Sequence, residues 1–341
     1  MIHEKEGVYM ATIQEVAKYA RVSVGSVSRY LNGHKLRPDN IKKIETAIEV
    51  LGYKENFFAK GLKSNQTRSI GLLMNNMQNN FSASLVAKID DVLEQQGYTI
   101  LLSNYRDDPN RIEQKIAFFE SRAVDGLIIV GAEQSWPQLE CLKNYDIPII
   151  SIITPLDSPK TDSIIVDNRA STKKVISKML SLSHKKIGVI AAPQTDYVAR
   201  ERFLGILDAY ESHNKRLLET DIYYGDYSKT SGKRAMEYLL SEGITAVFVC
   251  NYNMSLGALQ TIHENKLVIG KDISFASYDY FDASDIFHPK LTVIKQPIEE
   301  IGMLAAERLL EKIKNNNQLE GKVFTLTNEI LWRDSIVKKL S

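Results

Sequence analysis

Residues 12–33 read TIQEVAKYARVSVGSVSRYLNG, and this stretch decides the fold of the N-terminal part of the chain. Thr12 and Glu15 have the spacing of a capping box, in which the two side chains cap backbone N–H groups of the first helical turn, so we expect a helix to begin after Thr12. Ser23 follows a short turn and predicts the cap of a second helix over 24–31. Two short helices around a tight turn are typical of a helix-turn-helix.

The second of these helices would carry the DNA contacts, because its N-terminal residues face base edges in the major groove in such a motif. Val24 can touch a thymine methyl, Gly25 lets the backbone approach closely, and Arg29 can reach a guanine edge or a phosphate. Hydroxyl groups nearby are natural phosphate donors, and they belong to Thr12, Ser23, Ser26 and Ser28. A plain helical hairpin is the alternative interpretation of the same stretch.

A third helix is predicted to begin at Pro38, a good residue for a first helical turn, and to stop at Gly52. Its apolar residues have the i, i+3, i+4, i+7 spacing that closes a three-helix core: Ile41, Ile44, Ala47, Ile48 and Leu51. Residues 56–62 have helical potential, and the residues after them are polar and typical of a linker. We therefore expect a DNA-binding headpiece over 1–55 and a hinge and linker over 56–68.

The charge of the chain is unevenly divided. Residues 1–68 carry 12 Lys and Arg against 7 Asp and Glu, a balance of +5, whereas the whole chain carries +1, so residues 69–341 carry −4. A basic module on a mildly acidic body fits binding to a phosphate backbone. On charge alone, an ordinary solvated surface explains the numbers equally well.

The composition argues against several classes of protein. Cys141 and Cys250 are the only cysteines and lie in or beside apolar runs, so we expect a reducing compartment and no disulfide framework. No apolar run approaches the ~20 residues that cross a bilayer, and the first residues lack the apolar stretch of a signal peptide. We therefore expect a cytoplasmic protein with no membrane partner.

From Ser69 onward, segments typical of strands alternate with segments typical of helices. Strands are predicted over 70–74, 98–102, 127–130, 147–153, 187–190, 246–249 and 273–277. Helices are predicted over 81–96, 109–122 and 200–213, and from 255. Alternating strands and helices build parallel sheets with right-handed crossovers. Because the pattern restarts near residue 187, we expect two α/β lobes with a cleft between them.

The segments TIQEVA at 12–17, VSVGSVSRYLNG at 22–33 and LGY at 51–53 closely resemble the lactose-repressor/galactose-repressor family of bacterial transcriptional regulators. The resemblance implies a hinge helix over 56–62 that is ordered only on DNA. Two such helices from a homodimer would lie in the minor groove of a pseudo-palindromic operator. The expected DNA contacts therefore also include Asn32, Asn56, Ala59, Lys60 and Leu62.

Leu62 stands where the family places a leucine wedge, which enters a base step and kinks the duplex. Gly61 departs from the family pattern, and a glycine weakens a marginal helix by ~1 kcal/mol. The hinge of this chain would therefore melt more easily than the family pattern implies.

The resemblance continues over nearly the whole chain, for example through VDGLII at 124–129 and HKKI at 184–187. It implies a two-lobed sensor domain over 69–341, similar to periplasmic binding proteins, that closes on a small molecule. The N-lobe would span about 69–167 and 297–324, and the C-lobe about 168–295 and 325–341. The fold class is then an all-α helix-turn-helix headpiece plus an α/β two-lobed periplasmic-binding-protein-like sensor domain.

The effector of such a sensor is expected to be a sugar or a sugar derivative, which needs polar groups for its hydroxyls and flat aromatic faces for its C–H surfaces. Carried over position by position, the candidate effector-binding residues are Phe81, Asp167, Arg202, Tyr227, Asn251, Asp279 and Gln296. Arg202 would donate to two oxygens, and Tyr227 and Phe81 would stack. Structural alternatives exist: Asp279 could satisfy loop amides, Asn251 could cap the next helix, and Phe81 could be core.

Two departures from the family pattern bear on the ligand. Tyr252 follows Asn251 where the family often has Asp, and Ile153 ends a strand where the family often has Asp. The loss of carboxylates that accept from hydroxyls argues against a tightly chelated simple hexose. It favours a different or modified sugar, or a less polar ligand.

Three other functions were possible for a chain of this kind. An enzyme is disfavoured, because the histidines lack zinc spacing and no nucleophile-elbow, Walker A or dinucleotide motif occurs, so neither a catalytic residue nor a cofactor or metal is expected. A sugar-transport binding protein would need a secretion signal and would lack the headpiece. A regulator controlled by a protein co-effector stays open, because some relatives of the family use a phosphoprotein partner.

Overall fold

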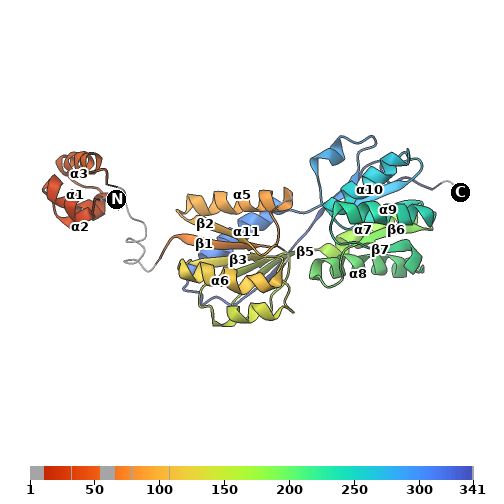
Figure 1. Ribbon diagram of the computed structural model, residues 1–341, viewed down its shortest axis with the longest axis horizontal. Helices are drawn as coiled ribbons and strands as arrows, with labels where there is room; N and C mark the ends of the chain where they lie inside the picture. Colours follow the sequence, from red (N-terminus) through yellow and green to blue (C-terminus); the bar gives the residue numbers. More distant parts are fainter. Residues whose placement is uncertain (1–10, 32, 54–65, 78–79, 107, 340–341) are drawn as a thin grey trace, which may run out of the picture. The chain divides into compact units, whose positions relative to one another are not determined.

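The structure is a computed structural model that describes residues 11–31, 33–53, 66–77, 80–106 and 108–339. The chain forms two compact units, residues 1–67 and residues 68–341 (Figure 1). The expected DNA contacts at Asn32, Asn56, Ala59, Lys60 and Leu62 lie outside the described residues.

The N-terminal unit contains three helices, α1 (Ile13–Ala20), α2 (Val24–Leu31) and α3 (Pro38–Leu51). Both halves of the predicted capping box are present: the Glu15 backbone N–H donates to Thr12 Oγ1 over 3.3 Å, and the Thr12 N–H donates to Glu15 Oε2 over 2.7 Å. The turn that follows places Arg21 in the left-handed region, at φ 53°. The predicted helix-turn-helix is confirmed.

The core of this unit is small and lies between the three helices. Its fully or nearly fully buried side chains are Val16, Ala17, Ala20, Val27, Ile44 and Ala47. They come from all three helices, with Ile44 and Ala47 at predicted apolar positions of the third, so the third helix holds the first two in place. The shared core therefore fixes the position of α2 within this unit.

The larger unit contains two lobes, each built on one six-stranded sheet. In the first lobe the order is β11-β5-β4-β3-β1-β2, and every neighbouring pair is parallel. The strands are β1 (Ser69–Met74), β2 (Thr99–Asn104), β3 (Gly126–Val130), β4 (Ile149–Ile152), β5 (Asp162–Val166) and β11 (Val323–Leu326).

Helices cover both faces of this first sheet (Figure 1). One apolar core joins the sheet to α5 (Asn80–Gln95) and α11 (Ile298–Lys314). A second core, on the other face, joins it to α6 (Ile112–Ser121) and the 3-10 segment η2 (Pro137–Asn144). The helix predicted over 109–122 is divided in the structure: its first residues form a separate 3-10 turn, η1 (Pro109–Arg111), and α6 follows directly.

In the second lobe the strand order is β12-β10-β9-β8-β6-β7, and only β12 is antiparallel to its neighbour. The strands are β6 (Ile187–Ala191), β7 (Ile222–Tyr224), β8 (Ala246–Val249), β9 (Ser274–Tyr278), β10 (Thr292–Lys295) and β12 (Glu329–Leu331). Two short 3-10 segments, η3 (Glu219–Asp221) and η4 (Asp282–Asp285), lie in its loops.

Two helix pairs sandwich this second sheet. On one face lie α9 (Lys229–Ser241) and α10 (Tyr252–Glu264), and on the other α7 (Asn168–Ser181) and α8 (Tyr197–Ser212). The first pair packs through glycines: a Cβ added to Gly257 would lie 2.0 Å from the Lys229 carbonyl oxygen, and one added to Gly232 would lie 2.2 Å from that of Met254. Neither position therefore tolerates a side chain without a shift of the helices.

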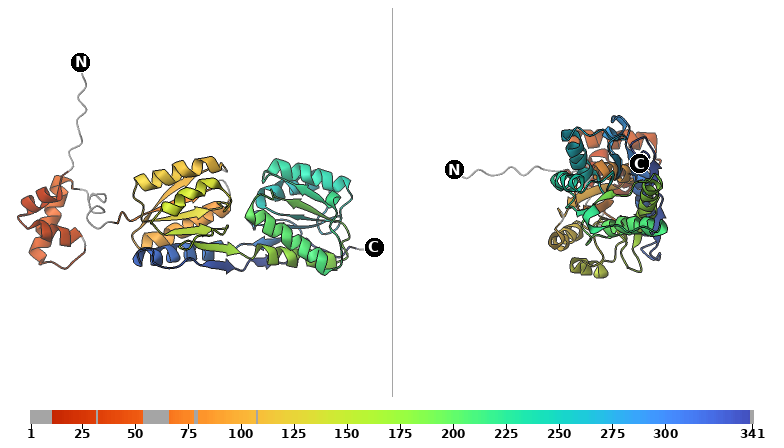
Figure 2. Two further views of the ribbon diagram at one scale, coloured as in Figure 1. Left: turned by 90° about the horizontal axis from the view of Figure 1, so that it is seen from below. Right: turned by 90° about the vertical axis from the view of Figure 1, so that its right-hand side faces the viewer.

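The chain passes between the lobes three times, along one side of the larger unit (Figure 2). The passages follow β5 at residue 167, β10 at residues 296–297 and β11 at residues 327–328. We call these three passages the crossovers. Because β11 continues to Leu326, the third crossover lies slightly later than the expected position near 325. The predicted two-lobed α/β fold is confirmed.

Within the described residues, no helix is long and apolar enough to span a bilayer. The same residues contain no group of three or more His, Cys, Asp or Glu side chains that could hold a metal ion. Cys141 and Cys250 are both free thiols.

Candidate functional site

A cavity of 1220 Å³ lies between the two lobes of the larger unit. Residues at the carboxyl ends of the strands of both sheets line it, which is where open α/β sheets bind ligands. Six of the seven candidate residues line this cleft: Phe81, Arg202, Tyr227, Asn251, Asp279 and Gln296.

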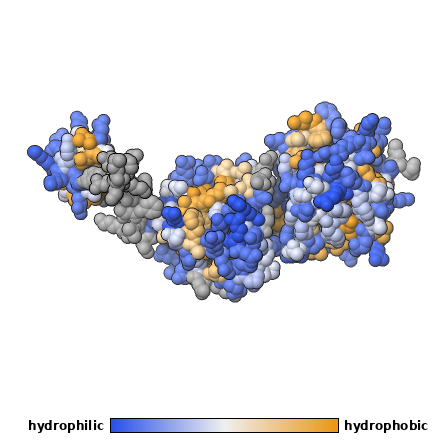
Figure 3. Space-filling view, viewed as in Figure 1, coloured by the Kyte–Doolittle hydropathy of each residue, from blue (hydrophilic) through white to orange (hydrophobic). Residues whose placement is uncertain are grey.

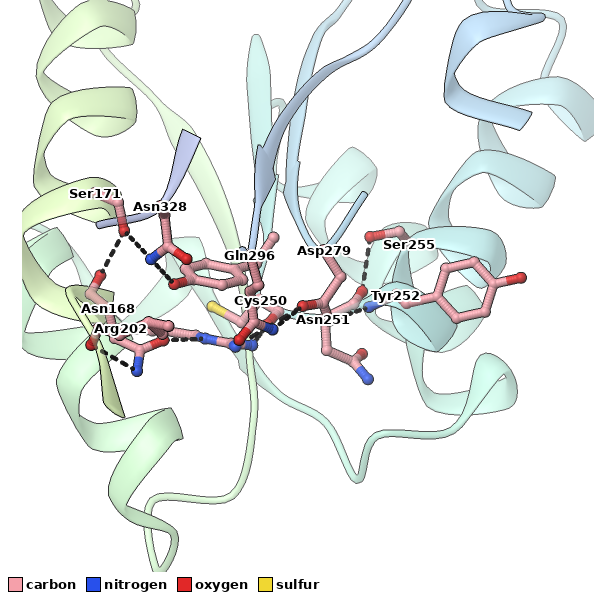
Figure 4. A network of polar contacts seen from close by, with 12 residues as sticks. Asn168, Ser171, Arg202, Cys250, Asn251, Tyr252, Ser255, Asp279, Gln296 and Asn328 are labelled. Carbon is pink, nitrogen blue, oxygen red and sulfur yellow. Dashed lines mark hydrogen bonds and ion pairs between the residues drawn. The ribbon is translucent and has the colours of Figure 1, made fainter. Parts of the chain in front are cut away.

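Arg202 lies on α8 and is only 5% exposed. Its Nε donates to Asn168 Oδ1 over 3.0 Å, and its Nη1 donates to the Cys250 carbonyl oxygen over 2.6 Å. The guanidinium carbon lies 3.5 Å from the centre of the Tyr278 ring, so the ring supports the guanidinium plane. The contacts appear together in Figure 4. Arg202 is thus held rigidly, with Nη2 beside Asp279 at 3.9 Å.

Asp279 follows β9 and has an unusual backbone conformation, with φ 72°. Its Oδ1 accepts from Gln296 Nε2 over 2.7 Å, and its Oδ2 accepts from the Tyr252 backbone N–H over 3.2 Å (Figure 4). A left-handed non-glycine residue costs about 1–3 kcal/mol, and such strain clusters at ligand sites. Asp279 thus satisfies the backbone amide of the first residue of α10, while its carboxylate also lines the cleft.

Asn251 also has a structural role, because it caps α10. Its Oδ1 accepts from the Met254 backbone N–H over 3.0 Å. The cap fixes the amide, and the residue lines the cleft beside Asp279. Capping and ligand contact are therefore compatible at this position, since the side-chain Nδ2 is a separate donor.

Aromatic side chains face the cleft from both lobes. Tyr227, at φ 65° in the second lobe, donates its hydroxyl to Asp196 Oδ2 over 2.8 Å. Burial, followed by the neighbouring Asp196 charge, raises the pKa of Tyr227, so its phenol stays neutral. Phe81 lies at the start of α5 in the first lobe, half-buried against the core and lining the cleft.

Asp167 does not line the cleft. Its Oδ1 accepts from both the backbone N–H and the side-chain Nδ2 of Asn328, each over 2.8 Å. Asn328 Nδ2 also lies 2.7 Å from the Tyr278 hydroxyl and 3.1 Å from Ser171 Oγ (Figure 4). Asp167 therefore joins the first crossover to the third, and the shared Tyr278 connects both to Arg202.

Sequence reasoning missed a contact between the lobes at Glu133, which is 6% exposed. Its Oε1 accepts from the backbone N–H of Tyr197, the first residue of α8, over 3.0 Å, and its Oε2 lies 3.6 Å from Arg200 Nη2. Burial raises the pKa of Glu133, partly offset by the Tyr197 hydrogen bond. The partners are 64 positions apart, so no local pattern could have indicated the contact.

Two further cleft residues were not candidates. Trp136 packs edge-on against Tyr105, with ring centres 5.8 Å apart. Ile153 lines the cleft at φ 78°, which is a genuine outlier for a β-branched side chain. Together they add apolar surface to the first-lobe wall, and Ile153 does so at the position of the expected departure.

The N-terminal unit presents the predicted start of α2 to solvent. Val24 is 43% exposed, and Gly25 and Arg29 are exposed as well. Ser23 Oγ accepts from the Ser26 backbone N–H over 3.1 Å, so these two hydroxyls first stabilise the helix. Thr12 is also exposed, while Ser28 is half-buried. Their contacts with DNA stay a prediction.

Models of known protein families match both units of the chain. The model for bacterial regulatory proteins of the lacI family matches residues 12–56, and the model for periplasmic binding proteins and the sugar binding domain of the LacI family matches residues 67–331. The chain belongs to the LacI family. As a LacI-family member, it is a DNA-binding transcriptional repressor.

Relatives of the LacI family match the chain over almost its whole length. The HTH-type transcriptional repressor PurR of Aliivibrio salmonicida (strain LFI1238) is 32% identical over 335 residues, which cover 96% of this chain and 100% of that protein. The PurR repressor of Pasteurella multocida (strain Pm70) is 30% identical and covers 97% and 100%, respectively.

Solved structures of LacI-family proteins agree with the fold. The Lac repressor dimer bound to operator and the anti-inducer ONPF has a TM-score of 0.85 at 27% identity, covering 96% of this chain and 100% of that chain. The complex of the transcriptional regulator CelR with cellobiose has a TM-score of 0.72 at 25% identity, covering 95% and 99%. The predicted family and fold are therefore confirmed.

Proposed function

We propose that this LacI-family repressor binds a pseudo-palindromic operator with an affinity that changes when a sugar derivative occupies the cleft. The observation that carries the proposal is the convergence of Arg202, Asn251 and Asp279 in a cleft that aromatic side chains also line. In this proposal the chain binds the ligand and releases it without a chemical reaction.

The polar end of the cleft suits adjacent hydroxyl groups. Arg202 Nη2 is a donor and Asp279 is an acceptor, and they lie 3.9 Å apart. Each carboxylate oxygen of Asp279 accepts one hydrogen bond from the protein and keeps a second lone pair. One hydroxyl could therefore accept from Arg202 while donating to Asp279, which a ligand without hydroxyls could not do.

The opposite wall favours a derivative over a plain hexose. Trp136, Phe81 and Ile153 offer apolar surface in the first lobe, where the carboxylate of Glu133 is already engaged by the Tyr197 N–H and Arg200. An apolar or ring-shaped substituent on the sugar would bury against these side chains. Cellobiose in CelR and ribose in the regulator from Enterococcus faecium are ligands of structural relatives that fit the sugar class.

Ligand binding would act on DNA through the angle between the lobes. A molecule that contacts Arg202 in the second lobe and Trp136 in the first lobe favours one degree of closure. Gln296, in the second crossover, donates to Asp279 of the second lobe, and Asp167, in the first crossover, accepts from Asn328 in the third. Because the crossovers are joined in this way to the second lobe and to one another, they would transmit the change. Coupling of this kind is typically 1–3 kcal/mol and acts equally in both directions.

We further propose that the chain acts as a homodimer, one recognition helix for each half-site. Hydrophobic residues gather in patches on the face shown in Figure 3, including patches over the first lobe. Exposed apolar side chains of that lobe are Met77, Leu102, Phe118, Met303 and Val323. The Lac repressor, which this chain resembles over its whole length, was solved as a dimer on its operator.

Isothermal titration calorimetry with a panel of sugars, aryl glycosides and sugar phosphates tests the ligand class. The account predicts saturable binding of at least one member to the full chain. Asp279→Asn keeps the size of the side chain and removes its charge, so it should weaken that binding by roughly tenfold or more. Arg216→Ala, at an exposed arginine outside the cleft, is the matched control. Equal affinity in Asp279→Asn and the wild type would refute the proposed polar end.

A further inference from the structure

A second concave surface lies on the second lobe and shares no lining residue with the cleft. It has a volume of 730 Å³ and lies between α7, the end of α8 and the start of the C-terminal segment. We call it the basic groove, and its lining residues are Lys173, Lys174, Ser177, Lys178, Ser181, His213, Asn328, Ile330 and Trp332. Nothing in the proposed function uses it.

Three lysines give the basic groove its charge. Lys173, Lys174 and Lys178 all lie on α7 and line the groove, and Lys174 and Lys178 are one helical turn apart. Within the described residues, none of the three is within ion-pair distance of a carboxylate. Lys173 does lower the pKa of Asp208, but the two oxygens of Asp208 are taken by Arg169 over 2.6 and 2.8 Å.

His213 adds a directed group on the α8 side. Its Nδ1 lies 2.8 Å from the Ala209 carbonyl oxygen, which can only accept, so Nδ1 carries the proton. Nε2 is then the ring atom left for a ligand.

Trp332 provides an apolar face at the edge of the basic groove. The side chain is 49% exposed, which is unusual for so large an apolar group. An indole face beside several cations is a suitable surface for stacking a flat ring. Lysines and an exposed indole together therefore select a ligand with both an anionic group and a ring.

Asn328 forms part of the lining and joins the basic groove to the crossovers. It is 6% exposed, and its Oδ1 is buried without a hydrogen-bond partner among the described residues. The same side chain donates to Asp167 and contacts Tyr278.

We propose that the basic groove is a second small-molecule site, which binds a phosphate ester that carries a flat ring, as in a nucleotide. The phosphate would lie between the three lysines and His213, since clustered ammonium groups are suited to a compact multivalent anion. The ring would stack on Trp332. The bound molecule would lie against Asn328, and so beside the third crossover.

The chain has two tryptophans, one at each site, which makes the proposal directly measurable. Trp136→Phe in the full chain leaves Trp332 as the only tryptophan and thus a reporter of the basic groove. Titration with adenosine monophosphate should change its fluorescence saturably, and inorganic phosphate should compete. Adenosine, which lacks the phosphate, should bind roughly tenfold more weakly or not at all.

A triple variant separates a built site from general surface charge. Lys173→Gln/Lys174→Gln/Lys178→Gln should weaken adenosine monophosphate binding by roughly tenfold or more. The matched control removes the same charge at exposed positions elsewhere, with Lys271→Gln/Lys314→Gln/Lys322→Gln, and should bind as the parent does. Equal weakening in both triple variants, equal binding of adenosine, or no saturable response of Trp332 would overturn the proposal.

The reciprocal variant, Trp332→Phe, leaves Trp136 to report the cleft. A nucleotide response of Trp136 that survives the Lys173/Lys174/Lys178 substitutions would mean that the nucleotide binds in the cleft, which would also overturn the second site. The sugar titrations of the cleft give their result independently of either outcome, so failure of one proposal is distinguishable from failure of the other.

Discussion

The carboxylate of Glu133 in the first lobe accepts a hydrogen bond of 3.0 Å from the backbone N–H of Tyr197 in the second lobe. Tyr197 begins α8, and the positive end of a helix dipole favours a nearby carboxylate. The contact joins the two lobes across the cleft. It therefore stabilises the arrangement of the lobes that the structure describes.

Glu133→Ala should open the lobes. The variant removes the hydrogen bond that the Tyr197 N–H donates to Glu133, a net contribution of about 0.5–1.5 kcal/mol, from the arrangement in which the lobes touch. Small-angle X-ray scattering of the full chain should show a larger radius of gyration than for the wild type. Glu140→Ala changes a carboxylate in the same lobe outside the cleft and serves as the control; identical scattering from Glu133→Ala and the wild type would contradict the role assigned to this contact.

The same contact predicts a dependence of lobe closure on pH. Burial raises the pKa of Glu133 in the arrangement in which the lobes touch, so contact between the lobes favours protonation of Glu133. This protonation-linked part of the stabilisation is fully present below the ordinary glutamate pKa and is lost as the pH rises through the raised pKa. Trp136 fluorescence in the Trp332→Phe variant should follow this change, and the added substitution Glu133→Gln should abolish it. A pH response that persists after Glu133→Gln would assign the titration to another group.

His184 should make the second lobe sensitive to acid. It is 1% exposed, with Nε2 at 2.8 Å from the Val337 carbonyl oxygen and Nδ1 at 2.9 Å from Thr245 Oγ1. Burial lowers the pKa of His184, so the folded state resists protonation. Its contribution to stability is present above the ordinary histidine pKa and is lost as the pH falls through the lowered value.

Urea unfolding of the wild type, His184→Gln and His263→Gln across this pH range measures that contribution. The slope of unfolding free energy against pH should decrease in His184→Gln, whereas His263→Gln, at an exposed histidine, should keep it. The prediction fails when both variants follow the wild type.

Lys312 should be important for the stability of the first lobe. It is fully buried, and its Nζ lies 3.2 Å from Asp162 Oδ1 and donates to the Lys160 and Leu319 carbonyl oxygens over 3.0 Å each. Lys312→Met removes one partner of a buried ion pair, which costs about 3 kcal/mol. Chemical denaturation of Lys312→Met and of the exposed control Lys314→Met compares the two, and a similar free energy of unfolding for both would contradict the assigned role.

Local patterns in the sequence predicted the N-terminal unit and most strands. Caps, turns and apolar spacings mark these elements, and such signals act within a few residues. They gave no helix over 168–181, since α7 has lysine and serine at many positions and buries its apolar side chains on one narrow face. They also missed the edge strands β7, β11 and β12, which are short and partly exposed. The interior strands β5 and β10 and the helices α9 and α11 were not predicted either.

The site was predictable only where a resemblance supplied positions. Asp167 and Asn328 are 161 residues apart, and only the folded crossovers show that Asp167 binds Asn328 rather than facing the cleft. The same is true of Glu133 with Tyr197. Contacts between lobes depend on the packed arrangement of two sheets, and no spacing within one element encodes them.

The central claim is that a small molecule in the cleft changes the affinity for operator DNA. Fluorescence anisotropy with a pseudo-palindromic operator, selected by the protein from random DNA, measures it most directly, with a scrambled duplex as reference and a ligand identified by calorimetry. The account predicts that the ligand shifts operator affinity about 5–150-fold in the wild type and that Asp279→Asn loses the shift while keeping operator binding. Unchanged operator affinity at saturating concentrations of a ligand that binds the cleft would contradict it.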